Sequence, residues 1–151
     1  MCNNSKYFLI LYIYMIVYID GIFDLFHYGH LNSFKQCKDI DENIYLIVGI
    51  IGDDVAEKYK RRPIIKEKYR YEIIKNINLV DEIVENPPLI VTKEFMDKYK
   101  IDLVVHGFSN PDDNSNQEEF FEYPKSINKF KEILYYSELN TTDIINNILN
   151  M

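Results

Sequence analysis

Two histidines three positions apart, with a glycine between them, constrain this chain more than any other feature. They lie in the segment Asp20-Gly-Ile-Phe-Asp-Leu-Phe-His-Tyr-Gly-His30, between an apolar β-branched run and a stretch with helical periodicity. The first amides of a helix are unpaired and lie at the positive end of its dipole. We therefore expect His27, His30 and the start of that helix to form an anion-binding site.

Apolar runs alternate with amphipathic stretches along most of the chain. The pattern predicts strands at 13–18, 45–51, 82–84 and 103–106, and helices at 31–38, 53–60, 67–77 and 92–99. Strands that are apolar on both faces and alternate with helices indicate a parallel sheet covered on both sides. The predicted fold class is α/β, a Rossmann-like doubly wound parallel sheet.

The length of 151 residues and the hydrophobic content of 47% suit one domain with one core. We place this domain at 13–151, behind a lead-in at 1–12. The apolar run 7–19 is too short to span a bilayer and has no small-residue cleavage site, so we interpret it as a buried strand with a long lead-in and predict no transmembrane segment.

Charge and cysteine content exclude several classes of function. The formal net charge of -7 argues against general affinity for nucleic acid. The acidic stretch 112–122 is interpreted as a solvated loop. Cys2 and Cys37 give neither a disulfide framework nor a metal-binding pair, which favours a reducing, cytoplasmic compartment.

The distinctive polar residues follow the predicted strands. Open parallel sheets bind ligands at the carboxyl ends of their strands. Residues 20–30 follow the first strand, 53–54 the second and 106–107 the fourth. Near the end of the chain, Asn140-Thr-Thr-Asp143 has the form of a helix N-cap before an apolar-periodic run to Leu149. Such a helix would point its first amides at the same site.

Two imidazoles beside a helix N-terminus suit phosphoryl transfer. A triphosphate attacked at its α-phosphorus spreads negative charge over its oxygens, and fixed donors stabilise that charge without a covalent intermediate. A metal-binding triad of Asp24, His27 and His30 is an alternative. We favour the anion site, because the glycine and the helix start already explain the spacing, and we assign no metal ligands.

The whole segment matches D-G-x-x-D-x-x-H-x-G-H at every fixed position. It resembles the signature of the cytidylyltransferases of phospholipid synthesis, which are nucleotidyltransferases of the HxGH type. The likeness extends from about residue 13 to residue 150. The segments that carry it are 46–49, 58–60, 70–71, 80–84, 91–95, 101–107 and 141–145. Segments 121–125 and 137–145 most resemble the second domain of the tandem members that use phosphoethanolamine.

The resemblance implies transfer of CMP from CTP to phosphoethanolamine with release of pyrophosphate, and Mg²⁺ bound through the CTP phosphates. It also implies pairing with a second such domain or with another copy, and a position in the cytoplasm at the surface of the endoplasmic reticulum. Phosphocholine as the acceptor, adenylyl transfer, and a non-catalytic nucleotide-binding or partner domain are the alternatives.

By position, the resemblance implies three groups of site residues. The catalytic group is His27, His30 and Lys60. The nucleotide-binding group is Gly21, Ile22, Phe23, Asp24, Gly29, Arg70, Thr141 and Thr142. The acceptor-binding group is Asp20, His106 and Gly107.

Three segments depart from the family pattern. Tyr135-Tyr-Ser-Glu-Leu-Asn-Thr141 stands where the family carries Arg-Thr-x-Gly-x-Ser-Thr, so the phosphate-binding arginine is missing there. Phe108 and Ser109 replace acidic residues, and Tyr69 replaces a glutamate. A neutral tyrosine cannot replace a bidentate guanidinium, so we expect weaker phosphate binding, which supports the non-catalytic alternative.

Overall fold

The computed structural model describes residue 6 and residues 13–151, so the predicted lead-in falls almost entirely outside the described residues. The described residues form a five-stranded sheet in the order β3-β2-β1-β4-β5, with all neighbouring strands parallel. The strands are β1 (Met15–Gly21), β2 (Ile44–Ile50), β3 (Glu82–Glu85), β4 (Leu103–His106) and β5 (Phe130–Glu132). The predicted Rossmann-like α/β class is confirmed.

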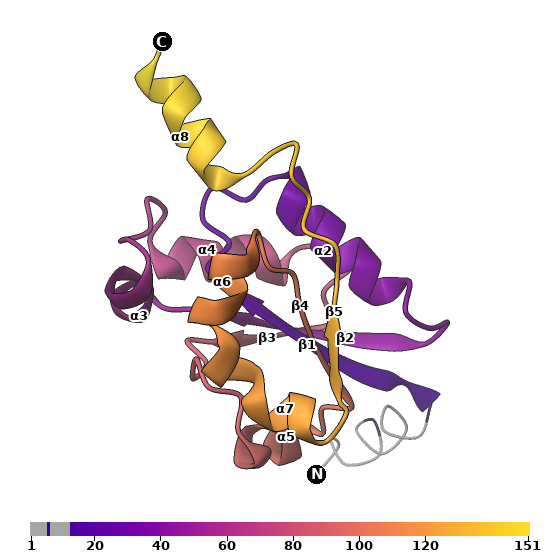
Figure 1. Cartoon of the computed structure of the whole chain (residues 1–151). Coiled ribbons are helices and arrows are strands. Elements are labelled where there is room, and N and C mark those ends of the chain that lie inside the picture. Colours follow the sequence, from indigo (N-terminus) through magenta and orange to yellow (C-terminus); the bar gives the residue numbers. More distant parts are fainter. Residues whose placement is uncertain (1–5, 7–12) are drawn as a thin grey trace.

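Helices connect the strands and cover the sheet (Figure 1). They are α2 (Tyr28–Lys38), α3 (Asp53–Tyr59), α4 (Glu67–Lys75), α5 (Lys93–Tyr99), α6 (Pro111–Asn116), the 3-10 helix η1 (Glu118–Phe121), α7 (Glu122–Ser126) and α8 (Thr141–Leu149). The four helices predicted between the strands are all present. Helix α2 begins three residues earlier than predicted because His27, rather than His30, is its N-cap.

Side chains of β1 alternate between two hydrophobic cores, one on each face of the sheet. Val17 and Ile19 pack with Phe34 of α2 and Ile74 of α4. Ile16 and Tyr18 pack on the opposite face, against residues of α5 and η1 that include Phe95, Met96 and Phe121. Both faces of the strand are therefore buried, as expected of a parallel sheet between two helical layers.

The first strand differs in its limits from the predicted 13–18. Met15 pairs with Ile44, the first residue of β2, whereas Ile13 and Tyr14 precede that register and are exposed. At its other end β1 continues to Gly21, which pairs with Ile50. The strand thus extends over the length for which β2 lies beside it.

The acidic stretch 112–122 is helical, which corrects its interpretation as a solvated loop. Asn110 caps α6 by accepting a hydrogen bond from the N–H of Asp113 at 2.9 Å, and Pro111 occupies the first turn. Acidic residues in a first turn are favoured by the helix dipole. Phe121, within the same stretch, is 1% exposed and joins the core. The acidic residues of this stretch therefore mark the first turns of α6, η1 and α7.

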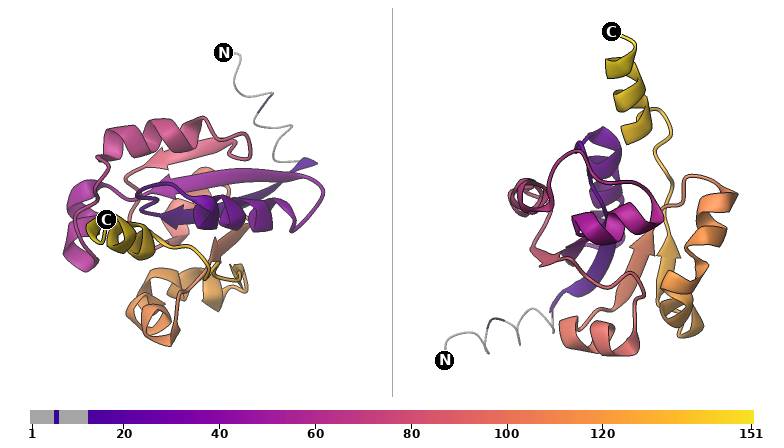
Figure 2. Two further views of the ribbon diagram at one scale, coloured as in Figure 1. Left: turned by 90° about the horizontal axis from the view of Figure 1, so that it is seen from above. Right: turned by 90° about the vertical axis from the view of Figure 1, so that its left-hand side faces the viewer.

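β1 lies between β2 and β4, so the connections leave it in opposite directions along the sheet. This switch point places the loops after β1 and β4 around a crevice at the carboxyl ends of the strands. Helix α8 follows β5 and projects beyond this edge, away from the sheet (Figures 1 and 2). None of its residues is buried. Within the described residues, no helix has the length and apolar character needed to cross a membrane.

Candidate functional site

A cavity of about 870 Å³ opens at the carboxyl ends of the strands. Its walls come from the residues that follow β1, α3, β4 and β5, with the start of α8 on one side. All the predicted site residues except Arg70 line it. The structure therefore brings together side chains from both ends of the domain.

His27 and His30 cap helix α2 through reciprocal hydrogen bonds. Nδ1 of His27 accepts from the N–H of Gly29 at 3.0 Å, and Nδ1 of His30 accepts from the N–H of His27 at 3.2 Å. This is the geometry of a capping box, with imidazoles in place of the usual hydroxyl and carboxylate. Because Nδ1 is the acceptor in both rings, each neutral ring carries its proton on Nε2.

Thr141, the first residue of α8, fixes the same tautomer of His27 from the other side. Nε2 of His27 lies 3.2 Å from Oγ1 of Thr141, and that hydroxyl donates to the carbonyl of Asp24 at 3.2 Å. A carbonyl only accepts, so the hydroxyl uses its one proton there and accepts from Nε2–H of His27. The network therefore runs from the α2 cap to the start of α8.

Burial keeps both imidazoles neutral. It lowers the pKa of His27, and burial followed by repulsion from His27 lowers the pKa of His30 to about 3. The two rings stack with their centroids 3.8 Å apart. They can therefore act on an anion as N–H donors, while the fixed positive field comes from the helix N-terminus.

Gly29 is required by the contacts of the motif. A Cβ atom at this position would lie 2.8 Å from Cε1 of His27 and 3.0 Å from the carbonyl oxygen of Leu139. The first contact would displace the imidazole, and the second would displace the segment that leads into α8. Glycine thus allows the His27 cap and the Thr141 network to form together.

The loop between β1 and α2 is strained and is held by its acidic residue. Phe23 and Leu25 adopt left-handed backbone conformations with φ of 54° and 49°. Between them, Asp24 is 4% exposed and accepts from the N–H groups of Ile64 and Ile65, each at 2.8 Å. The carboxylate predicted to lie beside the nucleotide is thus also the anchor of a neighbouring loop.

Arg61 donates to the same Asp24 carboxylate, from Nη1 to Oδ2 at 3.0 Å. Burial would raise the pKa of Asp24, but the N–H groups of Ile65 and Ile64, together with Arg61, lower it on balance. The group is therefore held in its charged form, with donors on both oxygens.

Arg70 lies behind the cavity, which differs from its predicted contact with the nucleotide. Its side chain is buried, and Nη1 donates to the carbonyls of Ile22 at 2.6 Å and Ile51 at 2.8 Å. Nη2 pairs with Asp53 at 2.8 Å. Because Ile22 and Ile51 follow β1 and β2, Arg70 ties these two strand ends together. Its guanidinium thus fixes the backbone of Ile22 and Ile51, which line the cavity.

Asp53 and Glu67 complete this support. The carboxylate of Glu67 accepts from the N–H of Asp53 at 2.6 Å, and that of Asp53 accepts from the N–H of Glu67 at 3.1 Å. Each acid thus caps the helix that the other begins, α3 or α4. The helix α3 that leads to Lys60 is fixed at its start by this pair.

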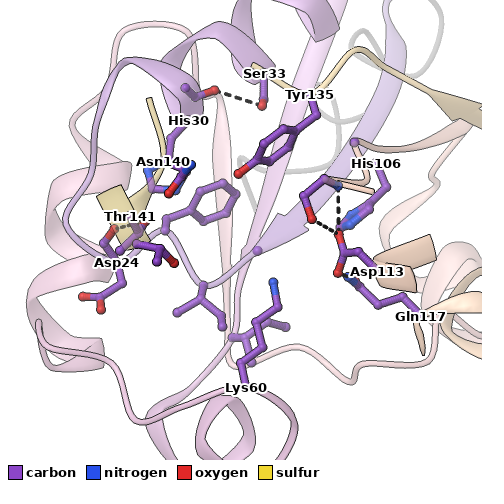
Figure 3. Close-up of a pocket in the computed structure, with 18 of the residues that line it drawn as sticks. Asp24, His30, Ser33, Lys60, His106, Asp113, Gln117, Tyr135, Asn140 and Thr141 are labelled. Atoms are coloured by element: carbon purple, nitrogen blue, oxygen red, sulfur yellow. Dashed lines mark hydrogen bonds between the residues drawn. The ribbon is translucent and has the colours of Figure 1, made fainter. Parts of the chain in front are cut away.

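Lys60 projects between two sides of the cavity, one with Asp24 and Thr141 and the other with His106 and Asp113 (Figure 3).

Asp113 accepts from the N–H and hydroxyl of Ser109 at 3.0 and 3.1 Å. Burial would raise its pKa, but the Ser109 N–H, Lys60 and Gln117 lower it on balance. Asp113 is not among the predicted site residues, because the acidic pattern of 112–122 favours a solvated loop. The N-cap signal of Asn110 followed by Pro could have found it.

Asp20 and His106 meet where β1 and β4 end. Nδ1 of His106 lies 3.6 Å from Oδ1 of Asp20, and both side chains are largely buried. The rings of Phe108 and Phe121 pack against His106 at centroid distances of 4.8 and 4.7 Å. A carboxylate and an imidazole with aromatic support thus form the end of the cavity away from α8.

Among the described residues, no group of three or more acidic, histidine or cysteine side chains is placed to hold a metal ion. A Mg²⁺ ion in this cavity would take most of its ligands from bound phosphate and water, which is the usual arrangement for nucleotide-bound magnesium.

Comparison with known proteins adds sequence evidence to this geometry. Residues 18–147 match the family model described as "Cytidylyltransferase-like". The chain is 40% identical over 134 residues to "Choline-phosphate cytidylyltransferase 2" of Arabidopsis thaliana, covering 88% of this chain and 44% of that protein. It is 35% identical to "Choline-phosphate cytidylyltransferase A" of Homo sapiens, covering 88% of this chain and 36% of that one.

A third relative carries a different acceptor in its name. "Ethanolamine-phosphate cytidylyltransferase" of Dictyostelium discoideum is 31% identical over 133 residues, which cover 88% of this chain and 36% of that one. The chain therefore spans less than half the length of these curated relatives. A lipopolysaccharide core biosynthesis protein from Thermoplasma volcanium has the same fold, with a TM-score of 0.64, 23% identity, and coverage of 82% of this chain and 98% of that one.

Proposed function

The chain belongs to the cytidylyltransferase-like family, and from this membership we propose that it transfers CMP from CTP to a phosphorylated amino alcohol. A phosphate oxygen of the acceptor attacks the α-phosphorus of CTP, the bond to the β-phosphate oxygen breaks, and pyrophosphate leaves with the electron pair. The observation that carries this proposal is the network from the α2 cap through His27 and Thr141 to Asp24.

In this proposal the two histidines stabilise the negative charge that develops at the α-phosphorus. Their Nδ1 atoms are engaged with the backbone, so Nε2–H of each neutral ring is the donor available to phosphate. Binding of CTP would replace or share the bond from His27 to Thr141. Lys60 and the first amides of α2 and α8 supply the remaining stabilisation, and Mg²⁺ bound through the CTP phosphates neutralises part of their charge.

We place the nucleoside along the backbone of Gly21, Ile22 and Phe23, beside Gly29 and Thr142, because these residues line the cavity next to the histidines. Arg70 acts there as a positioning residue, since its guanidinium holds the carbonyl of Ile22. The acceptor then occupies the opposite end, at Asp20, His106 and Gly107.

Two acceptors fit this end of the cavity for different physical reasons. The primary ammonium of phosphoethanolamine can donate hydrogen bonds to the Asp20 carboxylate, which favours the acceptor that the sequence resemblance implies. The trimethylammonium group of phosphocholine has no N–H but binds aromatic faces, and Tyr59, Phe120 and Tyr135 line the same cavity. The curated relatives named for choline phosphate, up to 40% identical, favour this second candidate.

Pairing with a second domain or another copy, and a cytoplasmic location at the endoplasmic reticulum, remain predictions from the resemblance. Because the chain spans under half of its relatives, a non-catalytic role beside a further domain is the alternative that an activity measurement must address.

The test is calorimetric titration of the purified chain with CTP and Mg²⁺, followed by pyrophosphate release with either acceptor. Pyrophosphate release with one acceptor supports the proposal and identifies the substrate. His27→Asn is the informative variant, because asparagine retains an N-cap while removing Nε2–H. Tyr28→Phe is the matched control next to it. Binding of CTP without release would support a non-catalytic nucleotide-binding role. Absence of binding would exclude both CMP transfer and nucleotide binding and would leave the partner-domain role.

A further inference from the structure

We propose that Arg61 is the guanidinium that holds the terminal phosphates of the nucleotide, oriented by Asp24. This inference deepens the proposed function and rests on it for the identity of the polyphosphate. The segment before α8 contributes Tyr135, Tyr136 and Ser137 to the cavity, so it offers no cation of its own. Arg61 comes from a different loop, the one that follows Lys60.

The charges around the cavity show why this side chain matters. Among the described lining residues, the permanent cations are Lys60 and Arg61, and the acids are Asp20, Asp24, Asp112, Asp113 and Asp143. The two histidines of the motif are neutral. A polyphosphate entering this cavity therefore meets an excess of carboxylates. Arg61 carries half of the permanent positive charge that can oppose them.

Arg61 is held in place yet keeps donors for a ligand. Its Nη1 donates to Asp24 at 3.0 Å and to the carbonyl of Arg62 at 3.2 Å. Its Nε and Nη2 groups make no hydrogen bond within the described part of the chain, and the side chain is 42% exposed. A guanidinium fixed along one edge presents its other N–H groups in the fork geometry that matches phosphate.

Asp24 does not depend on Arg61 for its own hydrogen bonds. Its Oδ1 accepts from Ile65 and its Oδ2 from Ile64, so both oxygens keep a backbone donor if the guanidinium moves towards a ligand. The ion pair can therefore loosen without leaving a buried carboxylate unsatisfied. The ion pair between Asp24 and Arg61 therefore suits a role in orienting the guanidinium for a ligand better than a purely structural role.

The position of Asp24 assigns Arg61 to the leaving-group side of the reaction. The carbonyl of Asp24 accepts from Thr141 at the start of α8, and Figure 3 shows both residues across the cavity from His106. The proposed acceptor end lies at His106 and Asp20. A cation anchored on Asp24 therefore contacts the β- and γ-phosphates, where the charge of the departing pyrophosphate collects.

The next residue provides a matched control. Arg62 pairs with Glu57 at 2.8 Å and with Asp54 at 3.4 Å, and it does not belong to the residues that line the cavity. Arg61→Ala and Arg62→Ala remove the same charge from adjacent positions. A difference in ligand affinity between the two variants therefore reflects a contact in the cavity and not the change in net charge.

The test is a calorimetric titration of the full chain, wild type and each variant, in the presence of Mg²⁺. The three ligands are CTP, CMP and inorganic tripolyphosphate. We expect Arg61→Ala to weaken CTP and tripolyphosphate by about 10- to 100-fold, the range for charge-assisted hydrogen bonds, and to leave CMP affinity nearly unchanged. Arg62→Ala should affect none of the three strongly. Arg61→Lys should lie between the wild type and Arg61→Ala, because an ammonium provides charge without the fork.

Equal losses for Arg61→Ala and Arg62→Ala, or an equal loss of CMP and CTP affinity in Arg61→Ala, would overturn the inference. An Arg61-dependent affinity for tripolyphosphate without any affinity for CTP would support the polyphosphate contact while excluding the proposed function. Failure of the wild type to bind either polyphosphate would reject both. Thermal unfolding of each variant verifies that the chain remains folded.

Discussion

Nε2 of His27 and Oγ1 of Thr141 lie 3.2 Å apart, although 114 positions separate these residues in the sequence. The contact joins the N-cap of α2 to the first residue of α8. Because the hydroxyl also donates to Asp24, it fixes which nitrogen of His27 carries the proton. The orientation of the proposed catalytic imidazole therefore depends on the far end of the domain.

Replacing Thr141 should affect catalysis more than folding. Thr141→Val keeps the shape of the side chain but removes the hydroxyl that links Nε2–H of His27 to the carbonyl of Asp24. The imidazole is then less well oriented before CTP binds, so we expect kcat/KM to fall by about 10-fold or more. Thr141→Ser retains the hydroxyl and should stay close to the wild type. Steady-state rates of pyrophosphate release measure the difference. A wild-type kcat/KM in Thr141→Val would show that this hydrogen bond has no role in catalysis.

Gly29→Ala should destabilise the fold by about 1–3 kcal/mol, because the added methyl group overlaps the His27 ring and the Leu139 carbonyl. Gly107→Ala is the comparison within the same cavity. A Cβ at Gly107 would meet Ile133 at 3.4 Å, close to ordinary van der Waals contact, so its effect should be smaller. Urea unfolding measures both, and equal free energies of unfolding would contradict this account of the glycine.

Stability should fall between pH 7 and pH 5 because His30 is buried in its neutral form. Its pKa is lowered from 6.5 to about 3 in the folded chain, so below pH 6.5 the unfolded state gains a proton that the folded state does not. The free energy of unfolding is therefore highest above pH 6.5. It decreases below that by up to about 1.4 kcal/mol per pH unit. The lowered pKa of His27 acts in the same direction.

His30→Gln provides the control for this pH dependence, because glutamine can occupy the same position of a capping box without titrating. We expect the variant to show a shallower decrease in urea-unfolding free energy between pH 7 and pH 5. An unchanged slope would mean that other groups cause the pH dependence.

Arg70→Met should lower the free energy of unfolding by about 3–5 kcal/mol, since it leaves Asp53 without its buried partner and the carbonyls of three residues, Ile22, Ile51 and Ile65, without their guanidinium donor. Arg62→Met removes an exposed guanidinium and should change stability by about 0.5 kcal/mol or less. Guanidinium chloride unfolding compares the two. Similar values would show that the Arg70 contacts contribute little to the fold.

The sequence alone was sufficient for the parts of the fold that depend on long apolar runs. β2 buries six of its seven residues and β4 buries the two at its centre, and the apolar runs that form them predict both strands with limits within one residue. β5 escaped prediction because Phe130–Glu132 is a short edge strand with two exposed charged residues. Its place in the sheet depends on pairing with β4, which no local pattern encodes.

The sequence predicts which residues gather at the site better than it predicts the direction in which their side chains point. The motif and the strand order indicate that His27 and Lys60 share a cavity. They do not indicate that Arg70 points into the protein or that Asp24 turns its carboxylate to another loop. Whether a charged side chain faces a ligand or a backbone carbonyl depends on packing between elements distant in sequence. Sequence periodicity contains little of that information.

Helix α8 contributes little to the stability of this domain but much to its proposed site. It buries none of its residues and extends away from the sheet, yet its first residue completes the histidine network. A protease that cleaves the exposed segment around Tyr135 and Ser137 would leave both hydrophobic cores intact. Limited digestion should therefore yield a folded fragment that lacks the proposed transfer activity. A synthetic α8 peptide added back should restore pyrophosphate release in proportion to its binding.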